Sequence, residues 1–146
     1  MERWMKRNGS AHWEGDLRTG KGTISTESGA LAAIPYSFAK RFGDEKGSNP
    51  EEIIGAAHAA CFSMALSAEL AKAHIVAEAI DTISTVELAR AAGGGFEIPR
   101  VHLAVTVKAP GADKAKVEAA TQTAKANCPV SKVLRAEITM DATYKI

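Results

Sequence analysis

The chain has 146 residues, of which 46% are hydrophobic and 24% charged, as in an ordinary globular domain with one modest core. Its formal net charge of +1, from 18 basic and 17 acidic residues, gives no electrostatic reason to expect nucleic acid or an anionic membrane as a partner. No run of about 18 consecutive apolar residues occurs, so no membrane span is expected. The basic start, residues 1–7, has no apolar run behind it, which argues against a secretory signal and favours a cytoplasmic protein.

The first third of the chain predicts short strands. Residues 11–18 alternate between apolar and polar side chains, and this period of two predicts a half-buried strand. Residues 19–22 predict a turn and residues 23–26 the returning strand. A further short strand is expected near Tyr36–Phe42, with loops around it.

The longest helical signal follows. Asn49 suits the N-cap, Pro50 suits the first helical position, and the pattern continues to about Ala73, which gives a helix about 36 Å long. Its apolar residues lie round most of the circumference, which predicts a helix buried on all sides. Small residues from Gly55 to Cys61 predict close approach of a second helix. A chain of this length is too short to surround such a helix alone, so an obligate homodimer is expected.

The remaining elements complete an α+β pattern. Residues 79–90 and 101–108 predict two strands joined by a glycine hairpin at 93–95. Asp113 can cap a helix that ends near Ala126, residues 129–134 predict a short helix, and residues 136–145 alternate as a final strand. The predicted order is βββ-α-ββ-α-α-β, with antiparallel sheet, in one domain spanning residues 1–146.

The two cysteines differ in their local setting. Without a secretion signal they are more consistent with a reducing compartment, where they are reactive or inert rather than a structural staple. Cys61 lies in mid-helix, where burial raises the pKa of a thiol and the helix dipole gives little help, so its neighbours alone favour an inert core residue. Cys128 lies near the start of the short helix, which favours a thiolate, although a turn residue without chemical consequence fits equally well.

Neither cysteine belongs to a recognisable metal motif. They are 67 positions apart (128 − 61), which is neither a CxxC motif nor a zinc-ligand spacing. His58 precedes Cys61 by three positions on the same helix face, but further ligands would have to come from His12, His74 or His102 at unrelated spacings. We therefore expect His58 to be a hydrogen-bonded interior residue and expect no metal.

Five segments, in order along residues 10–145, resemble the OsmC/Ohr family, and the osmotically inducible OsmC branch more than the organic hydroperoxide resistance branch. They are Ala-His-Trp-Glu-Gly-Asp at 11–16, Thr-Glu-Ser-Gly at 26–29, Ser-Asn-Pro-Glu-Glu at 48–52, Gly-Ala-Ala-His-Ala-Ala-Cys-Phe-Ser-Met-Ala-Leu at 55–66 and Cys-Pro-Val-Ser at 128–131. The resemblance includes both cysteines.

The resemblance implies a homodimeric, thiol-dependent peroxidase that prefers organic hydroperoxides, is regenerated by an external dithiol, and uses no bound cofactor. Carried over by motif, Cys61 is the peroxidatic cysteine, Cys128 the resolving cysteine, and Glu51 the acid that follows Asn-Pro. Arg41 matches the family's arginine, with Lys40 and Arg18 as alternatives.

These roles agree with the chemistry of peroxide reduction, in which the nucleophile is a thiolate. Arg41 can supply the positive charge that Cys61 needs, and Glu51 can hold the guanidinium in a bidentate pair. Glu51 and Cys61 are ten positions apart (61 − 51) on one predicted helix, about 15 Å along its axis. If they share a site, Glu51 comes from the partner subunit and the active site crosses the dimer interface.

Apolar neighbours of Cys61, namely Phe62, Met64 and Phe42, favour an alkyl hydroperoxide over hydrogen peroxide. Two other functions remain compatible with the sequence. One is a non-enzymatic stress or binding protein with structural cysteines, and the other is a general thiol–disulfide oxidoreductase.

Overall fold

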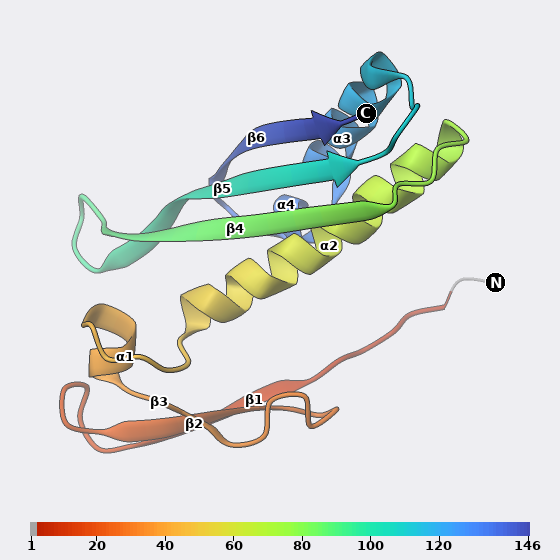
Figure 1. Cartoon of the computed structure of the whole chain (residues 1–146). Coiled ribbons are helices and arrows are strands. Elements are labelled where there is room, and N and C mark those ends of the chain that lie inside the picture. Colours follow the sequence, from red (N-terminus) through yellow and green to blue (C-terminus); the bar gives the residue numbers. More distant parts are fainter. Residues whose placement is uncertain (1–2) are drawn as a thin grey trace. The chain divides into compact units, whose positions relative to one another are not determined.

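The computed structural model describes residues 3–146 in two compact units, the first ending at Pro50 and the second running from Glu51 to Ile146. Figure 1 shows the three short strands and the small helix of the first unit and the longer sheet and helices of the second.

The first unit is a three-stranded antiparallel sheet in the order β1-β2-β3, with β1 at Gly9–Glu14, β2 at Lys21–Thr26 and β3 at Ile34–Tyr36. The first strand ends earlier than predicted and is mostly exposed. Beyond it the Asp16 carboxylate accepts the backbone N–H groups of Arg18 and Thr19 at 2.9 and 2.7 Å, which closes a turn. Leu17, which lies in the segment predicted as a half-buried strand, is 63% exposed in this turn.

The strand predicted at residues 36–42 was wrong beyond Tyr36. Helix α1 occupies Phe38–Phe42, and its N-cap Ser37 accepts the backbone N–H of Lys40 at 3.3 Å. A serine hydroxyl in that position satisfies a backbone donor that a strand would leave unpaired, so the chain turns into a helix.

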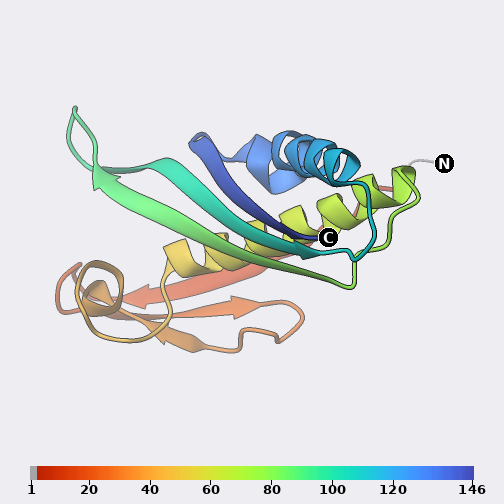
Figure 2. The same cartoon turned by 45° about the horizontal axis from the view of Figure 1, so that its top comes forward.

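The second unit places three helices on one face of a three-stranded sheet (Figure 2). Its helices are α2 (Pro50–Lys72), α3 (Lys114–Asn127) and α4 (Pro129–Val133). Its strands are β4 (Ala79–Arg90), β5 (Phe96–Lys108) and β6 (Glu137–Lys145), in the order β4-β5-β6. These elements confirm the predicted pattern from residue 50 onward.

The sheet of the second unit is mixed, not antiparallel throughout. β4 and β5 form the predicted antiparallel hairpin, whereas β6 pairs with β5 in parallel. The parallel pairing follows from the connection, because α3 and α4 return the chain across the sheet before β6 begins.

The core of the second unit lies between β5 and the helices. Phe62, Leu66 and Leu70 of α2 are buried together with the inward-facing residues of β5 and α3. The prediction that α2 is buried on every side was wrong for the single chain, since Met64 on the other face is 77% exposed. Only one stripe of the helix is needed to cover the sheet.

The small residues of α2 do allow another backbone to approach closely, and at Gly55 that backbone belongs to strand β4. A Cβ added to Gly55 would lie 3.0 Å from the carbonyl oxygen of Ser84 in β4. The helix neighbour predicted there is α4, which meets α2 at His58 and Cys61.

By length and composition alone, α2 is apolar enough to cross a membrane, and no other helix of residues 3–146 passes that test. Its inner stripe nevertheless packs in the core of the second unit, and His58 within that stripe is hydrogen-bonded to another helix. These contacts are those of a core helix.

Candidate active site

The structure brings the two cysteines together, although they are 67 positions apart. Cys61 lies in the middle of α2, and Cys128 is both the C-cap of α3 and the N-cap of α4. Their Sγ atoms are 3.2 Å apart, close enough for a hydrogen bond between thiols. Cys128 is fully buried and Cys61 is partly exposed, so Cys61 is the sulfur that solvent or a substrate reaches first.

Local sequence explains the position of Cys128. Pro129 disfavours a helical conformation in the residue before it, so α3 ends and Cys128 adopts φ −56° and ψ 129°. The cysteine side chain then acts as a helix cap, and its sulfur accepts the backbone N–H of Ser131 at 3.5 Å. This confirms the prediction that Cys128 lies at the start of the short helix.

The two thiols have opposite pKa shifts. Burial raises the pKa of Cys61, and the adjoining Cys128 acts in the same direction, while the N–H of Val130 opposes both. Burial also acts to raise the pKa of Cys128, but the N–H and hydroxyl of Ser131 together with the Cys61 thiol outweigh it and lower that pKa. The groups that adjoin the sulfur pair within residues 51–146 therefore favour a thiolate at Cys128 over one at Cys61. A thiolate at Cys61 requires a cation from outside this set of groups.

His58 is an interior residue, as predicted. It is 0% exposed, and its Nε2 lies 2.7 Å from Ser131 Oγ. Burial lowers the pKa of His58, so the imidazole is neutral near pH 7. Among residues 3–146, no three His, Cys, Asp or Glu side chains gather into a group able to hold a metal ion.

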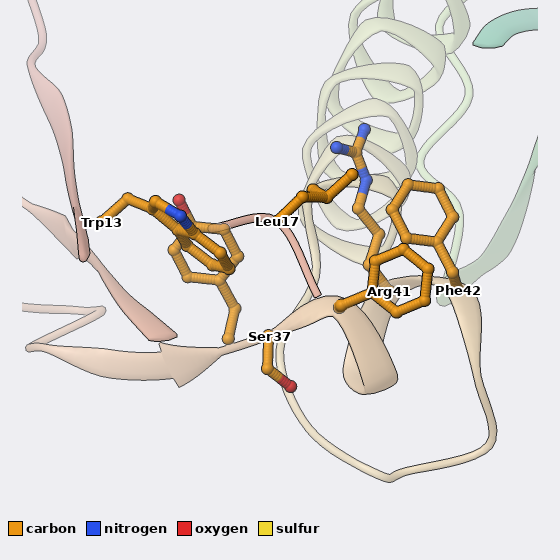
Figure 3. Close-up of a pocket in the computed structure, with 7 residues that line it drawn as sticks. Trp13, Leu17, Ser37, Arg41 and Phe42 are labelled. Atoms are coloured by element: carbon orange, nitrogen blue, oxygen red, sulfur yellow. The ribbon is translucent and has the colours of Figure 1, made fainter. Parts of the chain in front are cut away.

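Arg41 lines a cavity of about 270 Å³ in the first unit. The walls are mostly aromatic: they are Trp13, Leu17, Tyr36, Ser37, Phe38 and Phe42. Figure 3 shows the Arg41 side chain beside Phe42, and the guanidinium carbon lies 5.2 Å from the centre of that ring. The cavity therefore combines one guanidinium with an apolar wall, which suits a ligand having both a polar and an apolar part.

The two alternative cations are engaged differently. Lys40 Nζ forms an ion pair with Glu45 at 2.7 Å. The Arg18 guanidinium packs 5.0 Å above the ring of Phe38, a residue of the cavity wall. Of the three candidates, Arg41 is the one whose side chain lines the cavity.

Glu51 lies in the first turn of α2 and is partly buried. Since α2 is one continuous helix, Glu51 and Cys61 are separated by about 15 Å along its axis, as the sequence predicted. The helix does not bring Glu51 to the sulfur of its own chain.

Comparison with known proteins identifies the family. The family model described as OsmC-like protein matches residues 43–143. A protein named peroxiredoxin OsmC from Escherichia coli (strain K12) is 53% identical over 141 residues, which cover 97% of this chain and 98% of that protein. This chain belongs to the OsmC family. A protein of the same name from Shigella flexneri matches with the same identity and coverage.

Solved structures share the fold of this OsmC family member. The organic hydroperoxide resistance protein OhrB of Bacillus subtilis superposes with a TM-score of 0.72 at 24% identity, over 93% of this chain and 98% of that one. An organic hydroperoxide resistance protein from Elizabethkingia anophelis superposes with a TM-score of 0.77 at 22% identity, over 99% of both chains.

Sequence reasoning missed two features of this family member's candidate site. The aromatic wall round Arg41 joins side chains from β1, β3, α1 and the first turn, which no single motif connects. In the sequence Ser131 is only the last residue of a segment that resembles the family, and its contacts with Cys128 and His58 become visible in the fold. The Cys-Pro start of the short helix is the signal for the first contact, because an N-cap side chain accepts the backbone N–H three positions later.

Proposed function

We propose that this chain is a thiol-dependent peroxidase that reduces organic hydroperoxides, with Cys61 as the nucleophile and Cys128 as the resolving thiol. The observation that carries the proposal is the 3.2 Å separation of these two sulfur atoms, held on different helices. Relatives that are 53% identical over nearly the whole chain bear the name peroxiredoxin OsmC, which supports the class of enzyme.

The cycle has three steps. The Cys61 thiolate attacks one peroxide oxygen and the O–O bond breaks, which gives Cys61 sulfenic acid and an alkoxide that leaves as alcohol after taking a proton. The sulfur of Cys128 then attacks Cys61 and displaces hydroxide, so that a disulfide and water form. An external dithiol returns both cysteines to thiols by exchange. Closing the disulfide needs little movement, because 3.2 Å contracts to a bond of about 2.05 Å.

The first step requires a positive charge at Cys61, since burial raises the pKa of that thiol. We infer that Arg41 supplies it and that Glu51 orients the guanidinium, as the family resemblance implies. The helix geometry of Glu51 and Cys61 supports a site that combines two subunits.

The homodimer has its own support in α2. The exposed residues along this helix are apolar apart from Ser67 and, at its two ends, Glu52 and Lys72: they are Ala56, Ala57, Ala60, Met64, Ala68 and Ala71. A stripe of small residues lets a second backbone approach closely, so a second copy of the chain is a suitable cover for it.

The preference for organic hydroperoxides is supported by the aromatic wall beside Arg41. Of the three apolar residues expected near Cys61, Phe42 lines this cavity, Phe62 is fully buried in the core and Met64 lies on the exposed side of α2. Comparable catalytic efficiency with hydrogen peroxide and cumene hydroperoxide would remove this part of the proposal.

A thiol count tests the function. One equivalent of cumene hydroperoxide is added to the reduced protein, and free thiols are measured after denaturation. The expected result is the loss of two thiols per chain in the wild type and none in Cys61→Ser. No loss in the wild type would favour a binding protein with structural cysteines. Disulfide exchange without peroxide reduction would favour a general oxidoreductase.

Mixed dimers test the shared site. Subunits carrying Cys61→Ser are mixed with subunits carrying Glu51→Ala, and peroxidase activity is compared with that of each parent. A site built from two subunits restores about a quarter to a half of wild-type activity, because some mixed dimers contain one intact site. Activity no higher than that of the parents would contradict a shared site.

A further inference from the structure

A buried hydrogen bond between His58 and Ser131 lies beside the two sulfur atoms. His58 Nε2 and Ser131 Oγ are 2.7 Å apart, and the two residues are 0% and 9% exposed. His58 lies three positions before Cys61 on α2, and Ser131 lies three positions after Cys128 on α4. The histidine–serine contact therefore links the same two helices as the sulfur pair and lies one helical turn away from it.

Ser131 also contacts the resolving sulfur directly. Its backbone N–H donates to Cys128 Sγ at 3.5 Å, and its hydroxyl helps to lower the pKa of the Cys128 thiol. Ser131 is thus bonded to His58 on one side and to Cys128 on the other.

The ring nitrogen of His58 that carries the proton decides whether His58 or Ser131 donates the hydrogen bond between them. Among residues 3–146, His58 Nδ1 has no hydrogen-bond partner. A proton on Nδ1 would leave a buried N–H unpaired and would draw the Ser131 hydroxyl away from sulfur toward Nε2. With the proton on Nε2, the imidazole donates to Ser131 Oγ, and the hydroxyl hydrogen is free to turn toward Cys128.

We propose that His58 is a positioning residue that acts through Ser131 to hold the resolving sulfur of Cys128 against Cys61. This His58–Ser131 hydrogen bond sets the rate of disulfide formation and not the rate of attack on peroxide. The inference rests on the proposed peroxidase cycle. The Ser131 backbone N–H, with the hydroxyl turned toward the same sulfur, stabilises the Cys128 thiolate, which is the species that attacks the oxidised sulfur of Cys61.

The consequence for the enzyme is resistance to over-oxidation. Once Cys61 is a sulfenic acid, its sulfur either receives the attack of Cys128, which gives a disulfide and water, or meets a second hydroperoxide, which gives a sulfinic acid and an alcohol. Faster resolution favours the first outcome. Loss of the His58–Ser131 contact therefore shifts the balance toward sulfinic acid at a given peroxide concentration.

A peroxide-free reaction isolates the resolving step. Reduced protein is mixed with 5,5′-dithiobis(2-nitrobenzoate), whose released thiolate is followed by absorbance. Cys61, the more exposed sulfur, attacks the reagent first, releases one thionitrobenzoate and keeps the other as a mixed disulfide. Cys128 then attacks the sulfur of Cys61 and releases the second thionitrobenzoate at a rate independent of reagent concentration. Cys128→Ser gives only the first release.

Ser131→Ala and His58→Leu are expected to slow the second release about tenfold, the effect of losing a hydrogen bond to a charged group, and to leave the first within about twofold. His58→Gln is expected to restore the second release to within about twofold of wild type, because its amide can donate to Ser131 Oγ. Thr121→Val is the matched control, since it removes a buried hydroxyl that bonds only its own helix at 2.7 Å.

The same variants are then treated with excess cumene hydroperoxide, and sulfinic acid at Cys61 is measured by intact mass. It is expected to accumulate faster in Ser131→Ala and His58→Leu than in Thr121→Val. Equal slowing of both releases, an unchanged second release, or an equal effect in Thr121→Val would overturn the inference. If Ser131→Ala fails to fold, the contrast between His58→Leu and His58→Gln decides it. A normal second release with no thiol loss to peroxide would instead count against the peroxidase function.

Discussion

The Cys61–Cys128 disulfide should stabilise the folded protein, and the structure allows the size of the effect to be worked out. The bond would join sulfur atoms already 3.2 Å apart, on residues 67 positions apart. Cross-linking residues at that separation lowers the entropy of the unfolded chain by an amount equivalent to roughly 4 kcal/mol at 25 °C. Because the sulfurs start close together, little of this stabilisation is lost to distortion of the folded state.

The assay is urea unfolding of fully reduced protein and of protein oxidised with one equivalent of cumene hydroperoxide, at the same chain concentration. With a urea dependence of about 2 kcal/mol per molar, the midpoint should rise by about 2 M on oxidation. Cys128→Ser treated in the same way should show no such rise. A midpoint that stays the same or falls on oxidation, in protein shown to contain the disulfide, would refute the reasoning that the folded chain holds the two sulfurs ready to bond.

Three further predictions concern charge, protonation and packing. Arg41→Gln should raise the pH at which Cys61 becomes reactive to about the ordinary thiol pKa of 9.0 or higher. Oxidation of Cys61 at pH 7 should slow by roughly 10- to 1000-fold and recover at high pH, whereas an equal loss at every pH would contradict this. Burial lowers the pKa of His58 below 6.5, so below that pH the unfolded chain binds a proton that the folded chain does not, and stability falls by at most about 1.4 kcal/mol per pH unit. His58→Gln should therefore lose less unfolding free energy than wild type between about pH 7.5 and about pH 5, and an unchanged difference between the two proteins would argue against it. Gly22→Ala should destabilise the first unit by about 1–3 kcal/mol in fluorescence-monitored unfolding, because its Cβ would lie 2.5 Å from a backbone oxygen, whereas Gly93→Ala, with open space around it, should be neutral.

The helices and strands from residue 50 onward follow from local patterns that the sequence displays. Three local signals act within a few residues and can be recognised in the sequence: the proline at the start of α2, the aspartate before α3 and the alternation through β6. The direction in which β6 pairs with its neighbouring strand cannot be recognised from local sequence. Alternation reports which residues face the core, and it does not report whether the neighbouring strand runs parallel or antiparallel.

The errors in the first unit also have a local cause. Residues 16–18 continue the alternation of β1, but the Asp16 carboxylate captures two backbone N–H groups and ends the strand. Ser37 does the same for residues predicted as strand and starts α1. In both places a short polar side chain competes with the sheet for backbone hydrogen bonds.

The candidate site was predictable only in part. Mid-helix burial correctly argued that Cys61 lacks help from its own helix, and the structure raises its pKa for the same reason. Nothing in a separation of 67 positions predicts two sulfurs in contact, so their pairing came from the family resemblance alone. The bond between His58 and Ser131 joins residues 73 positions apart and was equally out of reach of local reasoning.

The central claim is that Cys61 attacks the peroxide and Cys128 resolves the product. The directions of the two pKa shifts within residues 51–146 favour the opposite order, with Cys128 as the thiolate. The direct test is intact mass of Cys128→Ser and Cys61→Ser after one equivalent of cumene hydroperoxide in the presence of dimedone, which traps sulfenic acid. We predict a rapid dimedone adduct on Cys61 in Cys128→Ser and none on the same time scale in Cys61→Ser. A faster adduct on Cys128 would contradict the assignment and make Cys128 the peroxide-reactive residue.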